Sequence, residues 1–262
     1  MLNRLAFAIF IALISGVPPA SAAMAVRETK FEWTTPDARR LGSEDLVGAV
    51  MEIRDFDGTI LTARLEAVEP ALEDPAILLH RFSVRDASGD WKPMCEADAY
   101  GRRAGFPVAG RWDARGRYVK DVESWFLACT SGSQGKCILW GYNPFRRSES
   151  GADLAPFYQA CQHMVRADYE GAGAAHTRNG TRIEMGDIAG VITGPSDGDP
   201  AWRFEAGWGP DGAVCVARTR WENLLPTKVL LESRPRLAAA PSDEAEARRR
   251  GALLFNRSKL PG

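Results

Sequence analysis

Residues 125–145 read WFLACTSGSQGKCILWGYNPF, and after a polar spacer residues 156–187 read PFYQACQHMVRADYEGAGAAHTRNGTRIEMGD. These two stretches hold three of the five cysteines, two of the three histidines and two of the eight tryptophans of the chain. The apolar pattern also changes here, from the alternation of strands to the longer period of a helix. The order of elements in this segment therefore decides the class of fold.

Residues 152–166 have the pattern of an amphipathic helix. Its apolar positions recur at spacings of three and four residues: Leu154, Phe157, Tyr158, Cys161, Met164 and Val165. Asp153 suits the start of this helix, and Gly171 and Gly173 end the element. Before it, Trp125–Cys129 and Cys137–Gly141 are expected to form two short strands around the loop SGSQGK.

Strand and turn signals surround this helix on both sides. Turns are expected at Asp57-Gly58, Ala114-Arg115-Gly116 and Asp211-Gly212. Strands are expected at 49–53, 59–65, 77–84, 107–112, 117–119, 181–185, 202–206 and 213–217. Because strands surround a lone helix instead of alternating with helices, the sequence predicts a β-rich α+β fold. We expect a single domain of strand hairpins packed around one central amphipathic helix and stabilised by disulfides.

The first 23 residues have the pattern of a secretory signal peptide. Arg4 precedes an apolar run at 5–14, and Ala20-Ser21-Ala22 forms a small-x-small cleavage site. The run is shorter than the ~20 residues that a membrane-spanning helix needs. We therefore expect an exported protein, periplasmic or extracellular, without membrane insertion after cleavage of the signal.

The rest of the chain is predicted to have three parts. Residues 24–45 are polar and irregular and are expected to form a flexible N-terminal arm. The main domain is expected at 46–232, with a β-rich first half at 46–125 and a second half at 125–232 that bears the motifs. Residues 233–262 are expected to form a C-terminal tail with a short helix at 243–255.

Charge and motifs exclude several classes of partner. The formal net charge is −1, which favours neither nucleic acid nor an anionic membrane. The segment Gly171-Ala172-Gly173 is too short to hold a phosphate and follows a helix instead of a strand. The acidic stretches at 55–58 and 196–199 are typical of turns and not of calcium loops. No cofactor or metal is predicted, and the ligand or protein partner stays open.

An exported chain meets an oxidising compartment, so disulfides are expected. The five cysteines are Cys95, Cys129, Cys137, Cys161 and Cys215. The odd number leaves one of them unpaired, which would also allow a disulfide-linked dimer. Spacing would suit a local bridge between Cys129 and Cys137, although fifteen arrangements of two bonds are open. We expect Cys161 or Cys215 to be the unpaired cysteine.

The sequence contains weak candidates for catalysis. His176 lies near Asp168, Glu170 and Asp187, and such a set can act as acid and base in a hydrolase. The simpler interpretation is a surface turn in which Asp168 pairs with an arginine or caps the helix. Cys161 falls on the apolar face of its helix, where a thiol is inert or bridged. Among the aromatic residues, Trp140 and Tyr142 are candidate ligand contacts, whereas most others suit a core.

Several spaced motifs in one order resemble the ADYC-domain family of exported bacterial domains. They lie at 136–142, 160–169, 177–187 and 208–215. The resemblance covers roughly Cys95 to Arg220, and it implies no established activity. Where the family has Ala-Asp-Tyr-Cys, this chain has Glu170 in the fourth position. The resemblance thus implies a sixth cysteine that is replaced here, which would explain the odd count.

The sequence-based hypothesis is an exported binding or structural module of unknown biochemical activity. This hypothesis rests on the spacing of the candidate residues, because no nucleophile, acid–base group or metal-ligand group has the spacing that catalysis requires. The alternative is a periplasmic or extracellular hydrolase that uses the His176 loop with Asp168, Glu170 or Asp187. Convergence of these four side chains in one cleft would favour the hydrolase.

Overall fold

The computed structural model describes residues 23–54, 58–194, 199–240 and 242–259, and its strands pair antiparallel. Most of the expected leader at 1–23, residues 55–57 of the first acidic stretch and most of the turn at 196–199 lie outside the described residues. No helix in the described ranges is long and apolar enough to cross a membrane. The chain forms a β-rich α+β domain with two disulfides.

The expected flexible arm at 24–45 is instead a three-stranded sheet followed by a 3-10 helix. Its elements are β1 (Ala23–Arg27), β2 (Lys30–Thr34), β3 (Arg40–Gly42) and η1 (Glu44–Leu46). Phe31 in β2 is fully buried, and its ring meets His80 and Trp125 edge-on at 5.3 and 5.2 Å. The prediction was wrong because the residues that bury this polar segment lie far away in the sequence.

A six-stranded sheet follows, with the order β11-β8-β6-β5-β4 and with β7 paired to β6. Its strands are β4 (Val50–Arg54), β5 (Ile60–Pro70), β6 (Leu78–Arg85), β7 (Trp91–Pro93), β8 (Gly105–Ala109) and β11 (Trp125–Cys129). The hairpin of β9 (Arg111–Trp112) and β10 (Tyr118–Val119) lies between β8 and β11 in the chain. The turn predicted at 114–116 is confirmed by this pairing.

One turn sequence, Asp-Ala-x-Gly, occurs three times in this half of the chain. It begins at Asp86, Asp98 and Asp113. In each case the aspartate carboxylate accepts hydrogen bonds from the backbone N–H groups two and four residues later, at 2.8–3.0 Å. A short polar side chain that bonds its own backbone stabilises such turns. The third turn, with Gly116 at φ 71°, forms one wall of the cleft described below.

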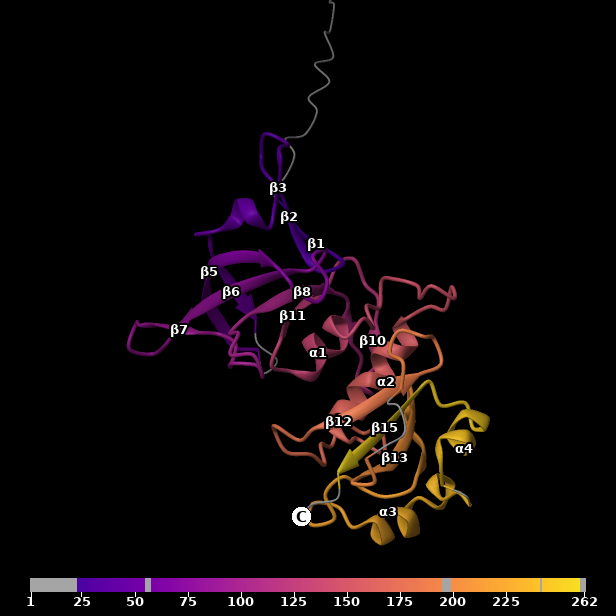
Figure 1. Cartoon of the computed structure of the whole chain (residues 1–262). Coiled ribbons are helices and arrows are strands. Elements are labelled where there is room, and N and C mark those ends of the chain that lie inside the picture. The colour runs from indigo at the N-terminus through magenta and orange to yellow at the C-terminus, as the bar shows by residue number, and fades with distance from the viewer. Residues whose placement is uncertain (1–22, 55–57, 195–198, 241, 260–262) are drawn as a thin grey trace, which may run out of the picture.

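Helices α1 (Ser133–Leu139) and α2 (Ala155–Arg166) connect the two halves of the molecule. The prediction of a strand at 137–141 was wrong, because a short apolar run does not distinguish a buried strand from a buried helix. A disulfide between Cys137 and Cys161 joins the two helices. The predicted amphipathic helix is confirmed as α2, although it begins at Ala155. Figure 1 shows both helices between the N-terminal sheets and the C-terminal sheet.

The C-terminal sheet has the strand order β12-β15-β13-β14. Its strands are β12 (Ile183–Asp187), β13 (Trp202–Gly209), β14 (Gly212–Val216) and β15 (Leu254–Lys259). α2 packs on this sheet, and α3 (Thr227–Ser233), η2 (Pro235–Leu237) and α4 (Glu244–Arg249) lead to its last strand (Figure 1).

The expected tail at 233–262 is therefore part of the domain, since β15 pairs with both β12 and β13. The helix expected at 243–255 is shorter, and it is followed by Gly251 at φ 83°. Leu254 and Phe255, which complete the helical pattern in the sequence, belong to the strand instead. The last strand of a sheet has partners far earlier in the chain, and local periodicity does not contain that information.

Candidate functional site

A stripe of polar residues lies along α2: Gln159, Gln162, His163 and Arg166. The first three side chains are buried, with exposed fractions of 6%, 5% and 6%. The spacing of three, four and seven residues places all four side chains on one face of the helix. Because buried polar groups need hydrogen-bond partners, the side chains of this stripe bind the loops that surround the helix.

The two glutamines hold two different loops against the helix. The Gln159 side chain accepts a hydrogen bond from the Tyr118 N–H at 2.8 Å and donates to the Gly116 carbonyl at 3.2 Å. It thereby fixes the β9–β10 hairpin. The Gln162 side chain accepts from the Ser133 hydroxyl at 2.8 Å and donates to the Ser133 carbonyl at 3.3 Å. It thereby fixes the first turn of α1.

His163 and Asp168 form a buried pair at the end of the helix. The Nδ1 atom of His163 lies 3.0 Å from the Asp168 carboxylate, which also accepts from the N–H groups of Ala172 and Gly173 at 3.1 and 2.8 Å. Burial alone would raise the pKa of Asp168, but these hydrogen bonds and the adjacent histidine hold it below its ordinary value. Asp168 therefore stays anionic and fixes the 168–173 loop.

The other nitrogen of the His163 ring faces the turn between β13 and β14. Its Nε2 atom lies 3.1 Å from the Pro210 carbonyl and 3.2 Å from the Gln159 side-chain nitrogen. The ring thus connects α2, the 168–173 loop and the turn between β13 and β14. These contacts give His163 a bracing role in the floor of the cleft.

A cleft of about 840 Å³ opens above this stripe. Its walls are the β9–β10 turn, the start of α1 and the 168–173 loop, and its lining includes Trp112, Arg115, Ser133, Gln134 and Arg166. Arg115 is exposed at the mouth, while Trp112, Gln134 and Arg166 are half-buried. A separate apolar groove of about 500 Å³ lies between the edge strands β4 and β11, and Trp112 also lines that groove.

The segment Ala167-Asp168-Tyr169-Glu170 closes α2 and joins it to the C-terminal sheet. Ala167 has a left-handed conformation with φ 52°, which ends the helix. The Tyr169 ring is fully buried and stacks on Trp208 at 5.2 Å. Its hydroxyl donates a hydrogen bond to the Glu205 carboxylate at 3.0 Å and accepts one from the backbone N–H of Arg220 at 2.7 Å.

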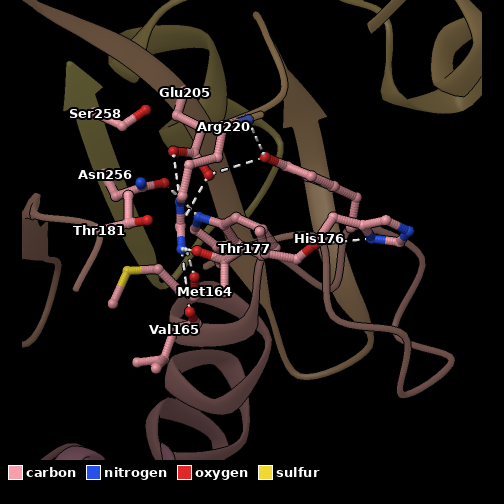
Figure 2. A network of polar contacts seen from close by, with 12 residues as sticks. Met164, Val165, His176, Thr177, Thr181, Glu205, Arg220, Asn256 and Ser258 are labelled. Carbon is pink, nitrogen blue, oxygen red and sulfur yellow. Dashed lines mark hydrogen bonds and ion pairs between the residues drawn. The ribbon is translucent and has the colours of Figure 1, made fainter. Parts of the chain in front are cut away.

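Arg220 is the centre of the network in Figure 2. Its guanidinium makes two hydrogen bonds of 3.0 Å to Glu205. It also donates to the carbonyls of Met164 and Val165 at 2.7 and 3.0 Å and to the Thr177 hydroxyl at 3.2 Å. The five N–H groups of an arginine thus have five acceptors. Two of these acceptors are carbonyls of the last turn of α2, and the Met164 carbonyl also accepts from the Ala167 N–H at 3.2 Å.

The structure does not bring the four predicted acid–base residues together. Of these four, only Asp168 lines the cleft. The Glu170 carboxylate pairs with Arg234 at 3.1 Å. The Asp187 carboxylate accepts three backbone N–H groups of the 189–192 loop and the Tyr142 hydroxyl. His176 lies beside Tyr169, and its Nδ1 is 3.2 Å from the Ala167 carbonyl.

The other candidate residues are mostly structural. Tyr142, a candidate ligand contact, is fully buried, and Trp140 is half-buried against the core. The disulfides are Cys95–Cys129 and Cys137–Cys161. The spacing argument for a Cys129–Cys137 bridge was therefore wrong, because each of the two cysteines pairs with one more distant in the sequence, at separations of 34 and 24 residues.

Cys215 has the free thiol and is fully buried in β14. Of the two cysteines expected to be unpaired, Cys215 is therefore the unpaired one, and Cys161 is bonded to Cys137. Burial raises the pKa of this thiol. A buried thiol that stays protonated is a poor nucleophile. It also cannot bond a second chain unless the sheet opens.

Gln159, Gln162 and Arg166 were not predicted as site residues from the sequence, and no role was predicted for His163. The sequence pattern that could have identified them is the polar stripe itself, in which polar residues recur three, four and seven positions after Gln159. A polar stripe on an amphipathic helix is usually solvated, and only the surrounding loops reveal that this one is buried.

The fold and the cleft define a disulfide-stabilised α+β domain with a polar cleft beside its central helix. The sequence model of the ADYC domain matches residues 43–222, which is more than half of the chain. The chain therefore belongs to the ADYC-domain family. No curated protein and no solved structure matches it.

Proposed function

We propose that the protein is an exported binding module and that the polar cleft beside α2 is its ligand site. The observation that carries this proposal is the cleft floor, in which Gln159, Gln162 and His163 are buried and held by the three walls. A preformed cavity with a few convergent polar groups is typical of a small-molecule site. The signal-peptide pattern at 1–23 and the two disulfides support export.

The contacts around the cleft favour binding over hydrolysis. Nucleophilic hydrolysis requires a hydroxyl or thiol in hydrogen-bond contact with a base. Here the Ser133 hydroxyl donates to Gln162, and His163 directs its Nε2 toward the Pro210 carbonyl. The Ser133 hydroxyl thus holds the start of α1, and the His163 ring holds the turn between β13 and β14.

The test is a small-molecule screen on the mature protein, followed by amide hydrogen exchange with each hit. A ligand of the cleft should protect residues 112–118, 132–134 and 168–173. Gln134→Trp, which fills the cleft, should abolish binding, whereas Ser88→Trp in a different turn should not. Protection elsewhere, or binding that survives Gln134→Trp, would show that the cleft is not the ligand site. Fractionation of cells that express the full chain tests export.

A further inference from the structure

We infer that the ligand of the cleft is an anionic sugar, a pyranose ring with a carboxylate or sulfate group, held by Arg115 and Arg166. This inference rests on the proposed function and names its ligand class. The cleft combines cationic side chains, amide and hydroxyl groups and an indole ring, and each part matches one part of such a ligand.

The charge of the cleft favours an anion. The ionisable residues that line it are Arg115, His163, Arg166 and Asp168. The Asp168 carboxylate is already occupied by His163 and two backbone N–H groups. The guanidinium of Arg166 donates one hydrogen bond to the Gly173 carbonyl. A guanidinium has five N–H groups, so donors remain for a carboxylate or sulfate.

Acidic side chains near the mouth of the cleft are neutralised by other arginines. Asp211 pairs with Arg117 at 2.7 Å, and Glu170 pairs with Arg234 at 3.1 Å. Asp113, in the same turn as Arg115, accepts hydrogen bonds from backbone N–H groups of that turn and lies outside the cleft lining. Among the described residues, the guanidinium groups of Arg115 and Arg166 form no ion pair with a carboxylate, so both remain available to an anion. Walls of low dielectric concentrate such a field at the mouth of a cleft.

The uncharged part of the lining suits a ring with hydroxyl groups. Trp112 is half-buried in the wall, where its ring packs against Tyr118, Phe126 and Tyr158, and the part of the indole that lines the cleft is apolar surface for a ligand. Ser133 and Gln134 also line the cleft, and both have polar side chains. An aromatic ring with polar groups beside it offers an apolar face and hydrogen bonds to the same ligand.

The walls favour a sugar over a peptide. An extended peptide binds by adding a strand to a sheet edge, whereas this cleft is bounded by turns and by the first turn of a helix. Its lining includes Gly116, Gly132, Gly171 and Gly173. These residues present backbone groups and little apolar surface for peptide side chains. The volume of about 840 Å³ lies in the range of small-ligand sites.

The test is calorimetric titration of the mature protein with four probes: trigalacturonate, its methyl ester, a sulfated disaccharide and inorganic sulfate. We expect the acidic sugars to bind at least about tenfold more tightly than the ester. Arg115→Gln and Arg166→Gln should each weaken binding by about tenfold, and Arg166→Lys should weaken it less. Arg182→Gln, an exposed arginine outside the cleft lining, is the matched control. An unchanged unfolding midpoint verifies that each variant is folded.

The outcomes test two proposals separately: that the cleft is a ligand site, and that its ligand is an anionic sugar. Equal binding of the acid and its ester overturns the anionic requirement, and equal binding of inorganic sulfate overturns the sugar. Preference for the carboxylate or the sulfate probe supports the inference and identifies the anionic group. If these probes fail while a screen hit is lost in Gln134→Trp, the ligand class is wrong and the proposed site stands. If the screen also finds no ligand of the cleft, both proposals fail.

Discussion

Arg220 and Glu205 are joined by two hydrogen bonds of 3.0 Å, and their side chains are only 2% and 0% exposed. The same arginine binds the Met164 carbonyl at the end of α2 (Figure 2). The same glutamate accepts a hydrogen bond from the Tyr169 hydroxyl. The segment Ala167-Asp168-Tyr169 therefore fastens the central helix to the C-terminal sheet. It thereby holds α2, which forms the floor of the cleft, in place.

Arg220→Met is expected to lower the free energy of unfolding by about 3–5 kcal/mol. The substitution leaves the Glu205 carboxylate buried without its cation and removes one hydrogen bond from each of two helix carbonyls. Urea unfolding measures the loss. The control is Arg27→Met, which breaks an exposed pair with Glu32 and should change stability by less than about 1 kcal/mol. Equal effects of the two substitutions would contradict the role of the buried pair.

His80 is expected to make stability depend on pH. The ring is fully buried between Phe31 and Phe82, and burial lowers its pKa to about 4 from the ordinary 6.5. The unfolded chain therefore binds a proton first as the pH falls. The stability contribution is complete above pH 6.5 and is lost between pH 6.5 and 4, by about 3 kcal/mol in total.

Urea unfolding between pH 4.5 and 7.5 measures this dependence. His80→Gln should remove much of the slope, whereas His176→Gln, at a half-buried site, should leave it. The difference between variant and wild type separates His80 from the carboxylates, which titrate alongside it at the acid end. A wild-type slope that persists in His80→Gln would refute the assignment.

Cys215 is expected to resist alkylation in the native protein. It is fully buried between the sheet and α4, in a cluster with Ala247, Ala252 and Phe255. Iodoacetamide labelling followed by peptide mass mapping should find this thiol unmodified until the chain is unfolded. Ser88→Cys, in an exposed turn, is the positive control. Rapid native labelling of Cys215 would restore the disulfide-linked dimer as an explanation for the odd cysteine.

Asp168→Asn is expected to loosen the 171–173 loop. The carboxylate accepts from His163 and from two backbone N–H groups, and the neutral amide provides a weaker acceptor. Hydrogen exchange of Ala172 and Gly173 should rise about tenfold or more, which corresponds to about 1–3 kcal/mol of lost local stability. Asp211→Asn, an exposed neighbour of the same loop, should leave the exchange unchanged. Similar exchange in both variants would show that Asp168 does not hold the loop.

The local sequence predicted those elements that local interactions stabilise. The apolar spacing from Leu154 to Val165 identified α2, and the turn signals at 114–116 and 211–212 identified two hairpins. The same kind of signal failed at Cys137, where a short apolar run is a helix held by a disulfide to Cys161. Local propensity is a weak guide wherever burial and a distant covalent partner decide the conformation.

The sequence by itself determined the class of fold, the central helix and the family. Only the tertiary structure decided the cysteine pairing, the place of the last strand between β12 and β13, and the cleft. Gln159 and Gln162 became parts of a cleft because loops from distant parts of the chain cover them. The physical reason is that burial and long-range hydrogen bonds depend on which segments meet, and the spacing of residues along one helix does not contain that information.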